Sequence, residues 1–276
     1  MAVACRVLQV SASGYYEWRG RAPSARSVAN ATLTAQIVEI HTMSRESYGV
    51  PRMLKELRLG RGIHCGRHRV ARLMRSAQIH GIYRRRGERR HPGAAVHDDL
   101  VRRRFVADAP NRLWLTDITE HPTGEGKVYC AAVLDVFSRR IVGWSIADHL
   151  RTELVVDALE MARWRRHPRG TIVHSDRGTQ YTAWAFGQRL RAAGLLGSMG
   201  RVASAVDNSM MESFWATMQR ELLNRSPHWT SRSELAAAIF EWIEAWYNPH
   251  RRHTSIGDLS PVDYERAHAP SSDAAS

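Results

Sequence analysis

Cysteine is scarce in this sequence. The 276 residues contain three, Cys5, Cys65 and Cys130, and no two of them form a C-x-x-C pair. A disulfide framework needs several paired cysteines, and a tetrahedral zinc site needs clustered cysteine and histidine ligands. The sequence therefore favours neither kind of structure.

Long hydrophobic runs are also missing. No stretch approaches the roughly 18 apolar residues of a membrane-spanning helix, and the opening residues, MAVACRVLQVSASGYYEWRGR, lack the apolar segment of a signal peptide. We therefore expect no membrane partner and a cytoplasmic location. The hydrophobic content of 43% still supports buried cores.

Acidic residues are outnumbered, with 27 Asp and Glu against 40 Lys and Arg, a net charge of +13. Residues 1–110 carry 21 basic against 8 acidic side chains, whereas the rest of the chain carries 19 of each. A segment of one sign favours a polyanionic partner, because each neutralised phosphate releases condensed counterions. The alternative is a basic surface that only keeps the protein soluble.

Helical periodicity dominates the first part of the chain. Short helical starts at residues 4–8 and 11–16 precede a Pro- and Ala-rich link, RAPSARSVANA, and further helices are predicted at residues 33–41, 51–59 and 67–76. The glycine-bearing connection LGRGIHCG joins the last two, as in a helix-turn-helix unit. We therefore assign residues 1–82 to a helical, helix-turn-helix DNA-binding region.

Two arginine clusters follow in residues 83–105, where apolar residues are few. This composition predicts a basic linker, assigned to residues 83–107. Its arginines either grip DNA phosphates or form a solvated charge run; those assigned to DNA are Arg84, Arg85, Arg86, Arg89 and Arg90.

Strand patterns begin at Asn111. LWLTDITE, KVYCAAVLDVFS and RIVGWSIA predict three consecutive strands, and TIVHSD a fourth after a helix at residues 152–164. Another helix is predicted at residues 181–193. Strands followed by alternating helix and strand indicate an α/β domain, a mixed sheet covered by helices, assigned to residues 108–267. Residues 268–276 are predicted to be a disordered tail.

Three carboxylates occupy unusual positions. Asp117 lies within an apolar strand pattern, Asp176 ends the fourth strand, and Glu212 lies beside the helical stripe of Met211, Trp215, Met218 and Leu222. Taken singly, they could be a buried partner for an arginine, a turn residue, and the end of a Ser209-x-x-Glu212 capping box. Together they suit a hard cation such as Mg²⁺, and two such ions about 4 Å apart could drive phosphoryl displacement.

Rival functions remain open at this level. The adjacent residues His174, Ser175 and Asp176 cannot form a catalytic triad, and no G-x-S-x-G motif is present. A glycosidase could use two carboxylates but leaves the basic half unexplained. The remaining rivals are a nuclease that only hydrolyses, and a helix-turn-helix regulator whose C-terminal half only dimerises.

Four blocks then carry a resemblance: LTDIT, HSDRGTQY, DNSMMESFW and WYNPHRRHTSIGDLSPVDY. The sequence resembles the second-frame (orfB-type) transposases of bacterial insertion sequences, which have a DDE, retroviral-integrase-like core. Between Asp176 and Glu212 lie 35 residues, the spacing for which that group is known. SGYYEWR and SYGVPRM resemble its helix-turn-helix segments, so the likeness covers nearly the whole chain. The closing block matches at Tyr247, Asn248, Arg251, His253, Ser260 and Pro261.

The resemblance implies a fold, a site and partners. It implies a ribonuclease-H-like fold with a mixed five-stranded sheet, and it makes Asp117, Asp176 and Glu212 the catalytic metal ligands for two Mg²⁺ ions, or Mn²⁺. The expected reaction is end nicking and strand transfer of an insertion sequence. The expected partners are the terminal inverted repeats, target DNA, an upstream-frame protein or fusion, and a second copy of the chain on nucleoid DNA.

Further DNA contacts are expected at Arg177, Arg220 and Arg251. The sequence also departs from the family pattern. Gln219 stands seven places after Glu212, where many relatives have a basic residue, and Arg220 follows it. Ser204-Ala205-Val206 replaces a Gly-x-Cys before Asp207-Asn208, so no cysteine role is inferred there.

Overall fold

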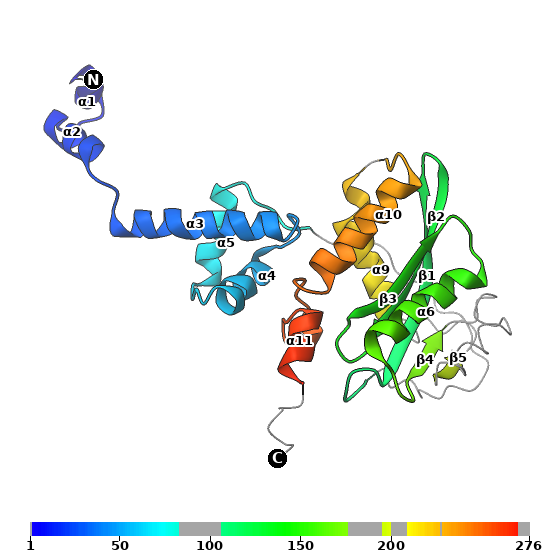
Figure 1. Cartoon of the computed structure of the whole chain (residues 1–276). Coiled ribbons are helices and arrows are strands. Elements are labelled where there is room, and N and C mark those ends of the chain that lie inside the picture. Colours follow the sequence, from blue (N-terminus) through cyan, green and yellow to red (C-terminus); the bar gives the residue numbers. More distant parts are fainter. Residues whose placement is uncertain (1, 83–105, 176–194, 200–208, 227, 270–276) are drawn as a thin grey trace, which may run out of the picture. The chain divides into compact units, whose positions relative to one another are not determined.

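The structure, a computed structural model, describes residues 2–82, 106–175, 195–199, 209–226 and 228–269 (Figure 1). Two compact units make up the chain, Met1–Gly81 and Ile82–Ser276. The first is helical and the second contains the sheet. In the described part of the chain, no helix combines the length and the hydropathy that crossing a bilayer requires.

The first unit consists of consecutive helices: α1 (Ala2–Val7), α2 (Ala12–Gly20), α3 (Ala25–Met43), α4 (Val50–Lys55), the π-helical turn η1 (Glu56–Gly60) and α5 (Arg67–Ser76). Helix α3 begins well before residue 33, so most of the predicted link at residues 21–31 is helical. The cause is an N-cap, because the side chain of Ser24 accepts a hydrogen bond from the Ser27 amide at 3.2 Å.

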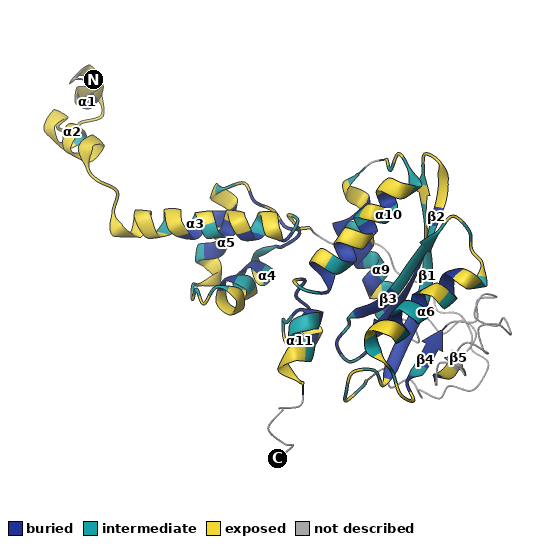
Figure 2. Ribbon diagram, in the orientation of Figure 1, coloured by how far each residue is buried: buried dark blue, intermediate teal, exposed yellow. Residues whose placement is uncertain are grey.

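Helices α3, α4 and α5 form the core of the first unit. Ile37, Met53 and Val70, one from each of these helices, are fully buried. Figure 2 shows buried stripes on these helices, whereas α1 and α2 are exposed over most of their surface. The core therefore belongs to the three helices that contain the predicted helix-turn-helix unit.

The second unit contains a five-stranded sheet of order β3-β2-β1-β4-β5. Its strands are β1 (Leu113–Thr123), β2 (Gly126–Asp135), β3 (Ile141–Ala147), β4 (Ile172–Ser175) and β5 (Leu196–Met199). The first three strands pair antiparallel, and β1–β4 and β4–β5 pair parallel. This mixed sheet with flanking helices is the ribonuclease-H-like arrangement expected from the sequence.

Helices cover both faces of the sheet. Successive strand residues point to opposite faces, so Trp114 and Asp117 lie on different sides of β1. Trp114 packs with Val133 and with Val155 of α6 (Thr152–Arg166) in one apolar cluster. The other face is covered by α9 (Ser209–Glu221), which contacts β1, and by α10 (Arg232–Glu241), which contacts β2 (Figure 1).

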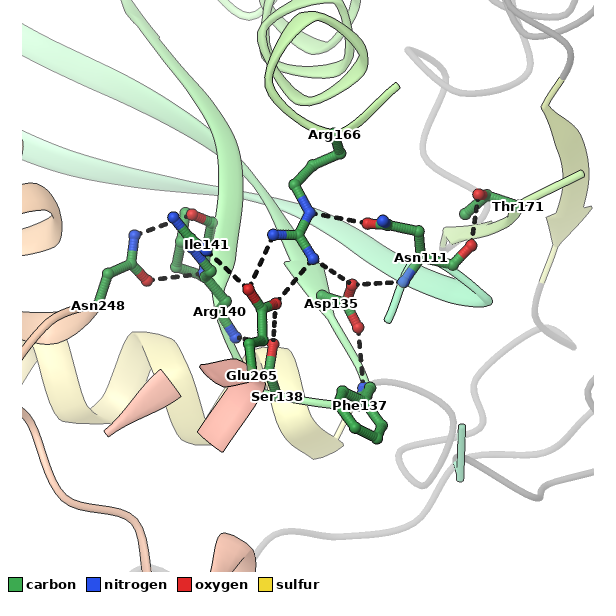
Figure 3. Close-up of polar contacts among 10 residues, drawn as sticks. All are labelled: Asn111, Asp135, Phe137, Ser138, Arg140, Ile141, Arg166, Thr171, Asn248 and Glu265. Carbon is green, nitrogen blue, oxygen red and sulfur yellow. Dashed lines mark hydrogen bonds and ion pairs between the residues drawn. The ribbon is translucent and has the colours of Figure 1, made fainter. Parts of the chain in front are cut away.

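The C-terminal elements fasten to one end of the sheet. The π-helical turn η3 (Trp242–Tyr247) is followed by η4 (Thr254–Ile256) and α11 (Pro261–Ala267), and Ser260 caps α11 by accepting from the Asp263 amide at 3.1 Å. Figure 3 shows Glu265 of α11 receiving hydrogen bonds from Arg140, Arg166 and Ser138.

Candidate active site and DNA-binding surface

Asp117 lies on the face of β1 that α9 covers and is half-buried. Its Oδ1 accepts a hydrogen bond from the Ile118 amide at 2.9 Å. Its Oδ2 accepts another from the indole Nε1 of Trp215, on α9, at 3.1 Å. The carboxylate is therefore held in one orientation between a strand and a helix.

Glu212 lies in the first turn of α9 and is half-buried. Met211, Phe214 and Met218 anchor the helix through buried side chains. Trp215 is three residues from Glu212, so the two side chains lie on one flank of the helix. Because Trp215 reaches Asp117, this flank faces β1. Helix α9 begins at Ser209, directly after residues that the structure does not describe, so the Ser209-x-x-Glu212 capping box stays an alternative.

Asp176 lies outside the described residues. The neighbouring strand β4 ends at Ser175, and its last parallel pair is Thr116 with Ser175. His174 and Ser175 are both buried. Among the residues that the structure describes, no three His, Cys, Asp or Glu side chains cluster as a metal site would require.

Most predicted DNA contacts also lie outside the described residues: Arg84, Arg85, Arg86, Arg89, Arg90 and Arg177. Arg220 is described and half-buried on α9, where Nη2 donates to Thr217 Oγ1 at 3.4 Å. The side chain of its neighbour Gln219 is exposed and donates to Asn224 Oδ1 at 2.6 Å.

Arg251 is not placed as a DNA contact would be. It is 3% exposed, and its Nε and Nη2 donate to the Glu221 carboxylate at 2.9 and 2.8 Å. A further contact links its Nη1 to the imidazole of His253, and its guanidinium lies 5.8 Å from the Tyr247 ring centroid. The guanidinium therefore joins α9 to the C-terminal segment. Its bonds to Glu221 and His253 also occupy the donors that a phosphate would need.

Sequence reasoning did not assign the basic face of α5. Val70, Leu73 and Met74 are buried, and the exposed positions of the helix include Arg67, His68, Arg72 and Arg75. The sequence of this helix, RHRVARLMRS, shows an apolar stripe with basic residues at most of the remaining positions. This pattern could have identified the surface.

The sequence matches known families over most of its length. The family described as "Integrase core domain" matches residues 107–205, and a second model with that description matches residues 194–261. The family described as "HTH-like domain" matches residues 28–87. The integrase matches include both Asp117 and Glu212.

Similar proteins include transposases for insertion sequence elements. The IS629 transposase of Shigella sonnei is 36% identical over 96% of this chain and 90% of its own length. The IS904 transposase of Lactococcus lactis is 37% identical over 89% and 98%, and transposase InsF for IS3A of Escherichia coli is 37% identical over 95% and 92%.

Among solved structures, the catalytic core domain of HTLV-2 integrase in complex with magnesium matches with a TM-score of 0.46 and 13% identity, over 58% of this chain and 99% of that chain. The simian T-cell lymphotropic virus intasome matches with a TM-score of 0.49 and 11% identity, over 85% and 75%.

The curated relatives share more than a third of their residues with this sequence and align with nearly its full length. The integrase-core matches fall on the sheet-bearing unit, and the HTH-like match falls mainly on the helical one. The chain belongs to the family of insertion-sequence transposases that carry an integrase core.

Proposed function

We propose that this protein nicks the ends of an insertion sequence and joins the freed 3′-hydroxyls to target DNA. The observation that carries the proposal is the junction of β1, β4 and α9. The β1–β4 pairing ends at Thr116 and Ser175, and the chain continues from these residues into Asp117 and Asp176. The flank of α9 that bears Glu212 faces the same part of β1 through Trp215.

The residues fit a hard divalent cation. Asp117 and Glu212 supply carboxylate oxygens from two neighbouring elements, and we assign Asp176 as the third ligand. Two bound Mg²⁺ or Mn²⁺ ions would supply an activated nucleophile and stabilise the leaving oxygen of an in-line displacement. The protein's own part is to hold the carboxylates in place, and the Trp215 hydrogen bond orients one of them.

DNA binding falls to both units. We assign the exposed cations of α5 to DNA, together with the arginines of residues 84–90, Arg177 and Arg220. Arg251 is left out because its donors are bonded to Glu221 and His253. Two DNA ends must be held together for transfer, so the proposed active form is at least a dimer on nucleoid DNA, with an upstream-frame protein or fusion.

The test compares strand joining by the wild type, Asp117→Asn and Glu212→Gln, on labelled duplex that carries the gene's flanking end sequence, with Mg²⁺ or Mn²⁺. Loss of metal stabilisation worth several kcal/mol predicts a fall of about 10³-fold or more in each variant. Both variants should keep the wild-type free energy of unfolding and DNA affinity.

Two other outcomes separate the rivals. Metal-dependent nicking without joining, even with the upstream frame fused, would identify a nuclease. DNA binding without any cutting, unchanged in both variants, would identify a binding protein and reject the transferase proposal.

A further inference from the structure

A pocket of about 490 Å³ lies where the chain enters β1 and where α6 passes into β4. The turn between β2 and β3 and the residue that follows α11 complete its walls. Arg112, on one wall, is five residues before Asp117, about 17 Å at the rise of a strand. Volumes of about 300–1,000 Å³ are typical of small-molecule sites, and none of the functions assigned above uses this one.

Hydrogen bonds fix the walls of the pocket. The buried Asp135 carboxylate accepts from the Asn111 amide at 2.8 Å and from the Phe137 amide at 2.9 Å, so it joins two of the walls (Figure 3). The carbonyl of Arg112 accepts from the Ile172 amide at 3.1 Å. A ligand would therefore not have to order these parts of the chain.

Two exposed arginines line the pocket, Arg112 and Arg169. Among the residues that the structure describes, neither guanidinium has a hydrogen bond or an ion pair. The arginines in the last turn of α6 differ, because each is paired with a carboxylate: Arg163 with Glu160, Arg165 with Glu244 and Arg166 with Glu265. The two pocket arginines therefore offer guanidinium forks of the kind that match phosphate geometry.

Asp108 lines the same pocket and is exposed. No ion pair joins it to Arg112 or Arg169, although the structure describes all three residues. A carboxylate here repels the continuous phosphate backbone of DNA, but it can accept hydrogen bonds from ribose hydroxyls, as acidic residues do in dinucleotide-binding sites. The pocket therefore favours a small phosphate ester with a sugar over a polyanionic strand.

An aromatic wall completes the lining. The ring of Phe137 is half-buried, and its centroid lies 5.0 Å from that of Tyr264 and 5.9 Å from that of His268. The His268 ring, which also lines the pocket, lies 4.2 Å from the Tyr264 ring centroid. Rings fixed in this way suit a planar base, because stacking on an aromatic side chain is tolerant of the kind of base.

We propose that this pocket binds a free nucleoside phosphate, with its phosphate on the two arginines, its ribose at Asp108 and its base against Phe137. The arginines alone would suit any anion, whereas the acidic and aromatic walls select an ester that carries a sugar and a base. The proposal goes beyond the proposed function and does not depend on it, because it uses none of the carboxylates assigned to metal.

The experiment is a calorimetric titration of the whole chain with ADP and with GDP, because the lining does not select one base. Divalent metal is left out, so that the carboxylates assigned to metal do not recruit the phosphates. Inorganic phosphate and adenosine are titrated in parallel, since each carries only part of the expected contacts. ADP should bind at least about tenfold more tightly than either, the scale of one charge-assisted hydrogen bond or one stacked base.

Arg112→Gln and Arg169→Gln should each weaken ADP binding about tenfold, because each variant removes a charged donor to the phosphate. Both side chains are exposed, so unfolding transitions should stay at the wild-type temperature. The matched control is Arg151→Gln, which removes the same charge from an exposed position at the other end of α6 and should leave ADP affinity unchanged.

Three outcomes would overturn the proposal. The first is a wild type that binds neither nucleotide, and the second is equal affinity for ADP and inorganic phosphate, which would identify a simple anion site. The third is ADP affinity that survives in both Arg112→Gln and Arg169→Gln. If the wild type ignores ADP and these two variants instead weaken duplex binding, the surface belongs to DNA. Strand joining tests the proposed function separately and is not needed for any of these results.

Discussion

The two faces of the sheet differ in the kinds of side chain that they bury. On the α6 face, Trp114, Val133, Val155 and Ala158 form a cluster with no charged member, and α6 approaches β3 so closely that a Cβ on Gly143 would lie 2.1 Å from the Ala158 carbonyl oxygen. Tight apolar packing of this kind supplies stability through burial and dispersion.

The α9 face also buries apolar side chains such as Phe214, but it adds buried polar and charged groups. Glu221, Asn248 and Arg251 are each less than 5% exposed, and Asp117 lies on the same side. Every one of these groups has a specific partner: Glu221 bonds Arg251, Asn248 bonds both the amide and the carbonyl of Ile141, and Asp117 bonds Trp215. The comparison teaches that both faces contain apolar packing, and that the α9 face adds the paired polar groups that hold carboxylates in place.

Arg251→Met should produce the largest effect on stability. A small effect would contradict the view that the α9 face depends on its buried charged pair. The variant leaves Glu221 charged and buried without its partner, so we expect a loss of about 4 kcal/mol in the free energy of unfolding by denaturant titration. The double variant Glu221→Leu/Arg251→Met should recover much of this loss. A normal stability with weakened DNA binding would instead return Arg251 to the DNA surface.

Gly143→Val should disturb the apolar face without touching the chemistry. The added side chain meets the backbone of α6, so we expect a loss of about 3 kcal/mol. Gly170→Ala, where nothing lies within 4 Å of the added Cβ, controls for changes in glycine content; its own positive φ of 64° costs less than a core clash. Strand joining per folded molecule should stay at the wild-type level in Gly143→Val at low temperature.

Glu265→Gln tests the network in which Glu265 of α11 receives hydrogen bonds from Arg140, Arg166 and Ser138 (Figure 3). Burial alone would raise the pKa of Glu265, but hydrogen bonds and charge from Arg166, with further hydrogen bonds from Arg140 and Ser138, lower it below 4.5. Since the lowered pKa belongs to the folded state, its contribution is complete above pH 4.5 and is lost as the pH falls through the folded value.

Glu265→Gln should therefore cost about 2 kcal/mol at pH 7 and less at pH 3, as acid and thermal unfolding would show. Asp135, whose pKa burial raises despite its amide hydrogen bonds and Arg166, acts in the opposite direction and is retained in the variant. An identical cost at both pH values would show that Glu265 contributes through packing alone.

Trp215→Phe should give the smallest effect and would sharpen the comparison most. The ring is kept and the N–H that orients Asp117 is lost, so strand joining should fall about tenfold, as for other groups that position metal ligands. The apparent Mg²⁺ requirement should rise, and the free energy of unfolding should change by less than about 1 kcal/mol. The matched control on the α6 face is Trp164→Phe, which should change neither strand joining nor the Mg²⁺ requirement.

The sequence predicted the fold well because its signals are local or carried by motifs. Helix α5 runs from Arg67 to Ser76 as its apolar spacing indicates, and the three-strand meander and the mixed sheet are confirmed. The start of α3 was wrong because one serine cap outweighed the composition of residues 21–31. The assignments of Asp117, Asp176 and Glu212 stay predictions, although the first and third lie on elements in contact.

Contacts between distant residues were the part that could not be predicted. The motif around Arg251 gave no sign of burial, because its partner Glu221 lies 30 residues earlier, on α9. The Trp215–Asp117 hydrogen bond joins residues 98 positions apart, and neither residue type predicts it. Burial and pairing of polar side chains depend on tertiary structure, which no local pattern encodes.

The order of the elements along the chain also has a consequence for biosynthesis. Strands β1, β2 and β3 pair with their neighbours in sequence, so they can form while the ribosome is still adding α6. Glu212 enters on α9, after all five strands, and the buried Glu221–Arg251 pair is complete only later still. A chain still under synthesis therefore lacks one proposed ligand until α9 is complete, so the proposed chemistry requires a nearly finished molecule.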